Sequence, residues 1–262
     1  VRAAKGAAAI GALASPGSTL EELHLLGRLM RGLGSENVDF RLRQRDFSPA
    51  GRTRGAPWLG MRIEEINRLD RMLLVGSFLR KDHPLLAARV RQAVKRGAQV
   101  SVLHAADDDL LMPLAARAIV APSGWVRSLA GVLAAVLQAQ DKPLPAGLAG
   151  VAPSESERAI AASLLGGERK AVFLGNAAVQ CDRAGALAQL AQALADATGA
   201  RLGFLGEAAN SVGGWLAGAL PGAQGLDARA MVEQPTCCWA PNRSSTTACR
   251  GRPRPRWRAP TP

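Results

Sequence analysis

The sequence has few of the residues on which metal and disulfide chemistry depend. Tyrosine is absent, aromatic residues make up 4% of the 262 residues, and there are four cysteines. Cys181 stands alone, Cys237 and Cys238 are adjacent, and Cys249 follows later, so the chain contains no C-x-x-C pair and no iron–sulfur run. This usage excludes the common metal-binding motifs and is typical of a reducing compartment. We therefore expect no metal site in this chain.

Further absences concern targeting and catalysis. No apolar run approaches the roughly 20 residues of a membrane-spanning helix, and no signal-peptide pattern follows Val1. Because the first residue is not Met, we expect the chain to begin inside a longer protein. The sequence also lacks a G-x-G-x-x-G run, a Walker loop and a G-x-S-x-G elbow. Residue patterns alone therefore assign no catalytic residue and no reaction.

The positive charge of the chain is unevenly distributed. The formal net charge is +12, and half of it comes from six arginines after residue 234, where no acidic residue occurs. Elsewhere acidic and basic residues are interspersed, without the basic stripe that is typical of a surface tracking phosphates. We therefore predict no nucleic-acid partner.

What the sequence does contain is an alternation of short aliphatic strands and amphipathic helices. Strand patterns occur at 5–13, 72–76, 99–104, 118–121, 171–176 and 201–206, and helix patterns at 18–33, 84–96, 123–137, 155–165 and 184–197. Ser18, with Glu21 three residues on, predicts a capping box for the first helix. The alternation predicts an α/β fold with Rossmann-like, mostly parallel sheets and helices on both faces. Such folds bind ligands at the carboxyl ends of their strands.

Proline and glycine interrupt this pattern between 138 and 153. We predict a first α/β portion over 1–140, a linker over 141–153 and a second α/β portion over 154–234. From 235 to 262 the chain has three of its four cysteines, six of its sixteen prolines and no aliphatic periodicity. We predict a disordered basic tail there.

One candidate ligand loop, 74–84, follows a predicted strand. Gly76 permits a tight turn, Pro84 opens the next helix, and His83 lies with Arg80 and Lys81 between them. Two interpretations are open: the helix start receives an anionic group, or the loop only turns the chain.

Two more loops carry polar residues after strand ends. Glu207, Asn210 and Gly213 lie in the glycine-rich segment 203–218, where they either bind a heterocycle or bond to the loop's own backbone. The run 107–109 holds three aspartates, which either bind magnesium or cap a helix.

Three stretches of the sequence together resemble one family. They are SPGSTLEELHLLGRLMRGLGSENVDFRLRQRDF (15–47), VGSFLRKDHPLLAARVRQAVKRGAQVSVLHAADDD (75–109) and GFLGEAANSVGGWLAGALPGA (203–223). They resemble the large iron–sulfur subunit of bacterial NADH-quinone oxidoreductase, respiratory complex I, in its molybdopterin-oxidoreductase-like portion. The resemblance spans about residues 5–234, and the runs GLGSENVD and HPLLAARVRQAVKRGA are its most specific parts.

The resemblance implies a role in respiratory electron transfer for the parent protein. That family carries iron–sulfur clusters, passes electrons from NADH toward quinone, and assembles with the other complex I subunits. It is peripheral to the cytoplasmic face of the bacterial inner membrane, attached only through the complex. The cluster ligands lie in a part of the family that has no counterpart here. We therefore expect a truncated scaffold piece that holds no cofactor and is inactive when isolated.

The resemblance also implies a role for the candidate residues. The molybdopterin-like domain of complex I is understood as a relic without molybdenum, and six residues match its cleft-lining loops: Gly76, His83, Pro84, Glu207, Asn210 and Gly213. We expect these six to be structural or vestigial. The alternative is a fragment of a molybdopterin-dependent enzyme, such as a formate-dehydrogenase-like catalytic subunit.

The tail departs from the resembled family at residue 235. There the family continues with a strand and an acidic loop, whereas this chain reads QPTCCWAPNRSSTT. The codons for Cys-Cys-Trp, followed by Ala, encode Leu-Leu-Gly when read two bases later, whichever synonymous codons are used. We therefore predict that the tail is translated out of frame. A genuine disordered basic tail is the alternative.

Overall fold

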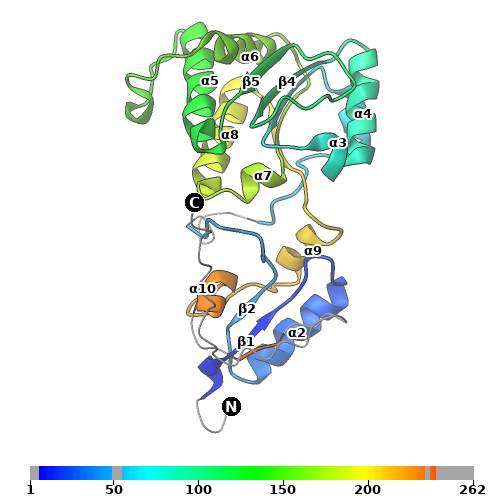
Figure 1. Cartoon of the computed structure of the whole chain (residues 1–262), viewed down its shortest axis with the longest axis vertical. Helices are drawn as coiled ribbons and strands as arrows, with labels where there is room; N and C mark the ends of the chain where they lie inside the picture. The colour runs from blue at the N-terminus through cyan, green and yellow to red at the C-terminus, as the bar shows by residue number, and fades with distance from the viewer. Residues whose placement is uncertain (1–5, 49–54, 234–236, 240–262) are drawn as a thin grey trace, which may run out of the picture. The chain divides into compact units, whose positions relative to one another are not determined.

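The computed structural model describes residues 6–48, 55–233 and 237–239. Its contacts divide the chain into two compact units. Unit 1 combines Val1–Leu42 with Ala208–Pro262, and unit 2 is the continuous segment Arg43–Glu207 (Figure 1). The unit boundaries thus fall at 42/43 and 207/208, whereas the segment 141–153 connects two helices inside unit 2.

A five-stranded parallel sheet forms the centre of unit 2, in the order β5-β4-β3-β6-β7. The strands are β3 (Arg71–Val75), β4 (Gln99–His104), β5 (Ala116–Ile119), β6 (Lys170–Leu174) and β7 (Arg201–Phe204). The chain proceeds from β3 outward to β5 and then returns to place β6 against the other side of β3. This reversal makes the carboxyl ends of β3 and β6 the switch point, where doubly wound sheets bind ligands.

The side chains of alternate residues in these strands are buried on opposite faces of the sheet. Leu73, Val75, Leu103, Val172 and Leu174 pack against α5 (Trp125–Ala139), α6 (Glu155–Leu165) and α8 (Ala184–Thr198). Met72, Leu74, Val102, Ala171 and Phe173 pack on the other side with α4 (Pro84–Lys95) and the 3-10 helix η2 (Ile63–Arg68). Short helices lie between these elements: α3 (Leu79–Asp82), η3 (Pro122–Gly124), η4 (Ala146–Leu148) and α7 (Asn176–Val179). Helices therefore cover both faces of the sheet (Figure 1), as the sequence predicted.

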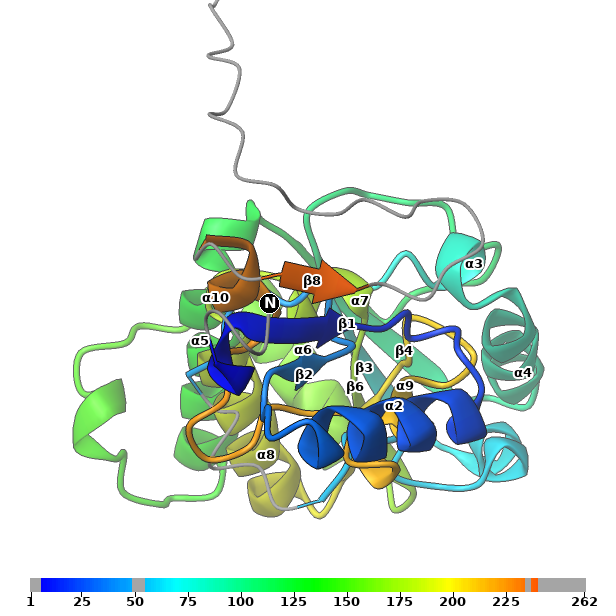
Figure 2. The same ribbon diagram turned by 90° about the horizontal axis from the view of Figure 1, so that it is seen from below.

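Unit 1 holds a smaller parallel sheet of three strands. In the order β2-β1-β8 these are β2 (Val38–Asp39), β1 (Ile10–Leu13) and β8 (Cys237–Trp239), and Figure 2 shows β1 between the other two. The helix α2 (Leu20–Gly32) connects β1 to β2 and packs Leu23, Leu26 and Met30 on the core of this unit. The remaining elements are η1 (Ala7–Ala9), α9 (Ser211–Leu216) and α10 (Ala228–Glu233).

The predicted fold class is confirmed, and some local predictions need correction. The capping box of α2 is formed by Thr19 and Glu22, one residue later than the predicted pair Ser18 and Glu21. The predicted disordered tail contains the short strand β8, while residues 240–262 lie outside the described residues.

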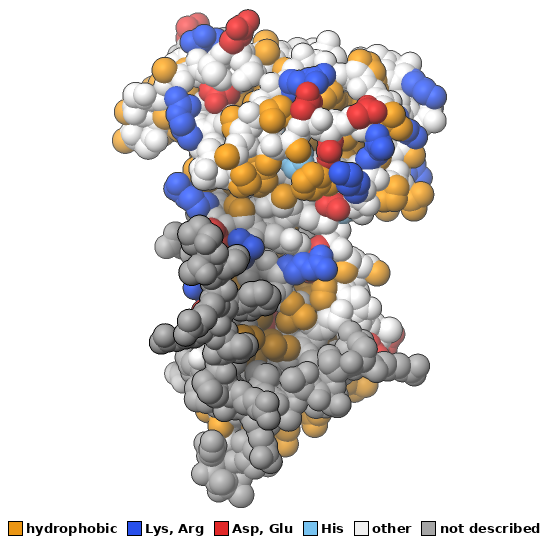
Figure 3. Space-filling view, viewed as in Figure 1, with side chains coloured by type: hydrophobic (Ala, Val, Ile, Leu, Met, Phe, Trp, Pro, Cys, Tyr) orange, Lys and Arg blue, Asp and Glu red, His pale blue; other side chains and the backbone are white. Residues whose placement is uncertain are grey.

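The described residues contain no membrane-spanning helix, and the face of unit 2 in Figure 3 shows no patch of charges of one sign. Among the described helices, none has the length and apolar character needed to cross a bilayer. On the face of unit 2 in Figure 3, basic and acidic side chains are interspersed.

Candidate functional site

At the switch point of unit 2, the loops after β3 and β6 are hydrogen-bonded to each other. The Gly175 N–H donates to the Val75 carbonyl at 2.9 Å, and the carbonyl of Gly76 accepts from Ala177 N at 3.0 Å and from Ala178 N at 3.3 Å. Two of the backbone N–H groups that open α7, those of Ala177 and Ala178, are therefore bonded to protein. They are not available to the phosphate that such a strand-to-helix turn can receive.

Two glycines permit this close approach. Gly76 has φ +55°, and a Cβ at this position would lie 2.7 Å from the nitrogen of Ala178. A Cβ on Gly175 would overlap the Cβ of Ser77. Contact between the two loops thus requires glycine at both positions, which explains Gly76 without a ligand.

Four of the six predicted residues lie at this carboxyl edge, where two of them bond within unit 2. The Nε2–H of His83 donates to the Gly206 carbonyl at 2.7 Å, and His83 immediately precedes Pro84, the first residue of α4. Glu207 accepts from the Gln180 amide at 2.6 Å. With Gly76 these residues tie neighbouring loops together.

Asn210 and Gly213, the other two predicted residues, lie in unit 1. The Asn210 side chain donates to the Ser18 carbonyl at 2.9 Å, and its backbone N–H donates to the Pro16 carbonyl at 3.1 Å. A Cβ on Gly213 would overlap the Asn210 side-chain oxygen. These two residues therefore hold the start of α9 against the loop that precedes α2.

The carboxyl edge of unit 2 also contains polar residues that sequence reasoning did not select. The Asn176 amide donates to Asp82 at 3.2 Å, and the Asn176 oxygen, the Ser77 hydroxyl and Nδ1 of His83 are buried without a protein partner. Ser77 and Asn176 each come within two residues of a strand end, which was the signal available in the sequence.

His104 ends β4 and is 3% exposed, with neither ring nitrogen hydrogen-bonded. Its ring meets Phe78 edge-on at 4.3 Å and stacks on Trp125 at 6.2 Å, both between centroids. Burial lowers the pKa of His104, and nearby Lys81 acts in the same direction, against the opposing charges of Asp108 and Asp82. The ring is therefore held neutral in an apolar setting.

The three aspartates after β4 form ion pairs, and neither of the two interpretations made from the sequence describes them. Asp107 binds Arg117 at 2.9 Å, Asp108 lies 3.5 Å from Lys81, and Asp109 lies 3.6 Å from Arg80. Each carboxylate faces a different cation, because consecutive side chains point in different directions. The pairs fasten this loop to α3 and β5.

The run GLGSENVD, the most specific part of the family resemblance, connects the elements of unit 1. Gly34 follows α2 with φ +83°, as expected at a helix end. The Ser35 hydroxyl donates to the Ile10 carbonyl at 2.6 Å. The Asn37 amide donates to the Ala8 carbonyl at 2.8 Å, and its oxygen accepts from the N–H of Leu226 at 2.8 Å.

Asp39, the last residue of that run, is fully buried and accepts four hydrogen bonds. Three come from Arg41, through its backbone N–H at 3.0 Å, Nε at 2.9 Å and Nη2 at 2.9 Å. The fourth comes from the Ala228 N–H at 3.0 Å. The Arg41 guanidinium also lies 5.4 Å from the ring centre of Trp215. The polar groups of this run are therefore used in holding unit 1 together.

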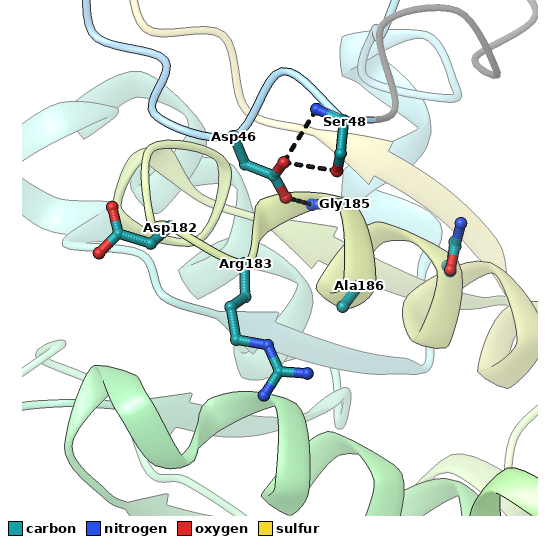
Figure 4. Close-up of a pocket in the computed structure, with 7 residues that line it drawn as sticks. Asp46, Ser48, Asp182, Arg183, Gly185 and Ala186 are labelled. Carbon is teal, nitrogen blue, oxygen red and sulfur yellow. Dashed lines mark hydrogen bonds between the residues drawn. The ribbon is translucent and has the colours of Figure 1, made fainter.

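A hollow of about 370 Å³ lies beside the start of α8 (Figure 4). Asp46 accepts from the Gly185 N–H at 2.9 Å and from both the hydroxyl and the N–H of Ser48. Burial acts to raise the pKa of Asp46, but these hydrogen bonds outweigh it, so the pKa is lowered. The carboxylate thus serves as a cap for α8 from a distant segment.

Among the described residues, the side chains do not assemble a metal site. No group of three or more His, Cys, Asp and Glu residues is close enough to hold an ion there. The thiol of Cys181 donates to the Ala178 carbonyl at 3.2 Å, and burial raises its pKa. The raised pKa disfavours the thiolate form of Cys181, which is the form that binds metals.

The fold and the switch point define the chain as a doubly wound α/β protein. The sequence profile of the molybdopterin oxidoreductase family matches residues 1–243, and the chain belongs to this family. No curated protein matches the sequence significantly. The formyltransferase/hydrolase complex (FhcABCD) from Methylorubrum extorquens, solved with methylofuran, contains a similar fold, with a TM-score of 0.51 and 16% identity. The similarity covers 75% of this chain and 52% of that one, so the chain spans about half the length of its structural relative.

The family implies a molybdopterin cofactor, and the described residues do not fit it. At the switch point, the N–H groups of Ala177 and Ala178 are already bonded to the Gly76 carbonyl. The unpartnered atoms of Ser77, His83 and Asn176 are closed off from solvent, so they do not face a ligand. Cys181 is engaged as a donor. These side chains therefore offer no free donor to a bound molybdopterin at the switch point.

Proposed function

We propose that this chain is a scaffold piece of the large iron–sulfur subunit of respiratory NADH-quinone oxidoreductase. The observation that carries the proposal is the closed switch point of unit 2. The carbonyl of Gly76 accepts from the N–H groups of Ala177 and Ala178 in the first turn of α7, in the place where an active member of the family would need room for a cofactor. A family member that keeps the fold but closes its ligand crevice fits a structural role.

The polar residues of the resembled motif support the same role. Ser35, Asn37 and Asp39 direct their side chains to backbone groups or to Arg41 within unit 1. These features favour a module whose surface, and not an internal cavity, meets other subunits.

In the intact complex, the parent subunit would transfer electrons from NADH toward quinone through iron–sulfur clusters held outside this chain. Its partners would be the other complex I subunits, at the cytoplasmic face of the inner membrane. The second candidate is a fragment of a formate-dehydrogenase-like subunit, and the match to the molybdopterin oxidoreductase family over residues 1–243 is the observation that favours it.

The test is the identity of the copurifying proteins. An affinity-tagged copy of the chain is expressed in a bacterium that contains both complex I and molybdenum enzymes, and bound proteins are identified by mass spectrometry. The proposal expects complex I subunits, in excess over a tag-only control. Recovery of formate dehydrogenase subunits in their place, or of no partner above the control, would contradict it.

A further inference from the structure

A second hollow lies at the amino edge of the unit 2 sheet, at the opposite ends of the strands from the switch point. Its volume is about 430 Å³. Three turns form it, and they lead into the neighbouring strands β3, β4 and β6: residues 67–71, 96–98 and 166–169, together with Ala93 of α4. Because these strands are adjacent in the sheet, the three turns are brought side by side by the fold.

The lining of this hollow is rich in arginine. It contains Arg68, Arg71, Arg96 and Arg169, against the two carboxylates of Asp70 and Glu168. Asp70 is used by Arg169, whose Nη2 donates to it at 2.9 Å and whose backbone N–H donates at 3.0 Å. These hydrogen bonds lower the pKa of Asp70, so its charge is committed to Arg169 over the ordinary pH range.

The other three guanidinium groups have no carboxylate partner among the described residues. Arg71 donates to two backbone carbonyls, those of Asp70 at 2.9 Å and Gly166 at 3.4 Å. The side chains of Arg68 and Arg96 make no hydrogen bond or ion pair within the described part of the chain. Arg96 lies at the end of α4, where the helix dipole favours one cation. The dipole of α4 does not explain why Arg68 and Arg71 also lie in this lining.

We infer that this hollow binds a phosphate-type oxyanion. Guanidinium groups match the geometry of phosphate and can bind it with two parallel hydrogen bonds, so an anion in this hollow would meet the exposed donors of Arg68 and Arg96, which have no protein partner among the described residues. It would also reduce the mutual repulsion of the cations in this lining, where four arginines lie with the two carboxylates of Asp70 and Glu168. The site is independent of the scaffold role proposed above, because it uses the opposite edge of the sheet.

The experiment measures binding of inorganic phosphate to the full chain by isothermal titration calorimetry at low ionic strength. The test variants are Arg68→Gln and Arg96→Gln, whose exposed side chains make no hydrogen bond or ion pair with the described residues. Arg158→Gln is the matched control: it removes the same charge from the exposed surface of α6, about 12 Å along the helix axis from Gly166. Circular dichroism verifies that all variants are folded.

We expect saturable binding at one site by the unaltered chain. Each test variant should weaken it about tenfold or more, because a hydrogen bond to a charged group is lost, while the control stays within about twofold. The inference is overturned if phosphate does not bind. It is equally overturned if Arg158→Gln weakens binding as much as the test variants, because the chain would then attract anions only through its net charge.

Discussion

Replacing Asp39 tests whether the resembled motif is structural. Asp39→Asn keeps the size of the side chain but removes a charge that is 0% exposed and accepts four hydrogen bonds. It removes the carboxylate with which the 7% exposed guanidinium of Arg41 pairs at 2.9 Å. Breaking a buried ion pair from one side costs about 3–5 kcal/mol. We expect a loss of this size in the free energy of unfolding.

The assay is urea denaturation followed by circular dichroism, with hydrogen exchange to locate the effect. Faster exchange is expected in β1, β2 and the start of α10, which the motif connects. The control Glu233→Gln breaks an exposed pair with Arg229 in the same unit and should cost only about 0.3–0.5 kcal/mol. Replacing both partners, as Asp39→Leu with Arg41→Met, should cost less than Asp39→Asn alone. A loss below about 1 kcal/mol for Asp39→Asn would refute the reasoning.

Three further predictions concern unit 2 and the tail. Burial lowers the pKa of His104, so the unfolded chain protonates this histidine more readily than the folded chain does. The free energy of unfolding should therefore fall as the pH drops below about 6.5. The urea midpoint should decrease with pH in the unaltered chain and in His24→Leu, and should decrease less in His104→Leu. Gly76→Ala should lower thermal stability, since φ +55° costs an L-residue about 1–2 kcal/mol and the new Cβ meets Ala178; Gly147→Ala, with open space around it, should not. Sequencing the source DNA across codon 235 should reveal a missing or extra base, and an intact frame would contradict the frameshift.

The sequence was a good guide to the sheet of unit 2 and a poorer one to the site. Its strands are regular aliphatic runs between helices, so their positions were predicted within a few residues. The two-residue strand β2 was missed because Val38–Asp39 is too short to show any period. The division into units depends on contacts between 6–42 and the segment after 207, which are remote in sequence and carry no local signal.

The same limit applies to the candidate residues. The sequence indicated Gly76, His83, Pro84 and Glu207 because each follows a strand end, and the structure places these four at one edge. It could not indicate that the Gly76 carbonyl accepts the N–H groups of α7, because that contact joins segments about a hundred residues apart. The ion pairs of Asp107, Asp108 and Asp109 depend in the same way on partners supplied by α3 and β5.

The most direct test of the central claim, that this member of the molybdopterin oxidoreductase family has a closed crevice, is the cofactor content of the purified chain. The chain is produced in cells that make molybdenum cofactor; molybdenum is measured by mass spectrometry and released pterin by its fluorescence after oxidation. Our account predicts far less than one molybdenum and one pterin per chain, whereas a bacterial formate dehydrogenase prepared alongside gives stoichiometric values. One pterin retained per chain would contradict it.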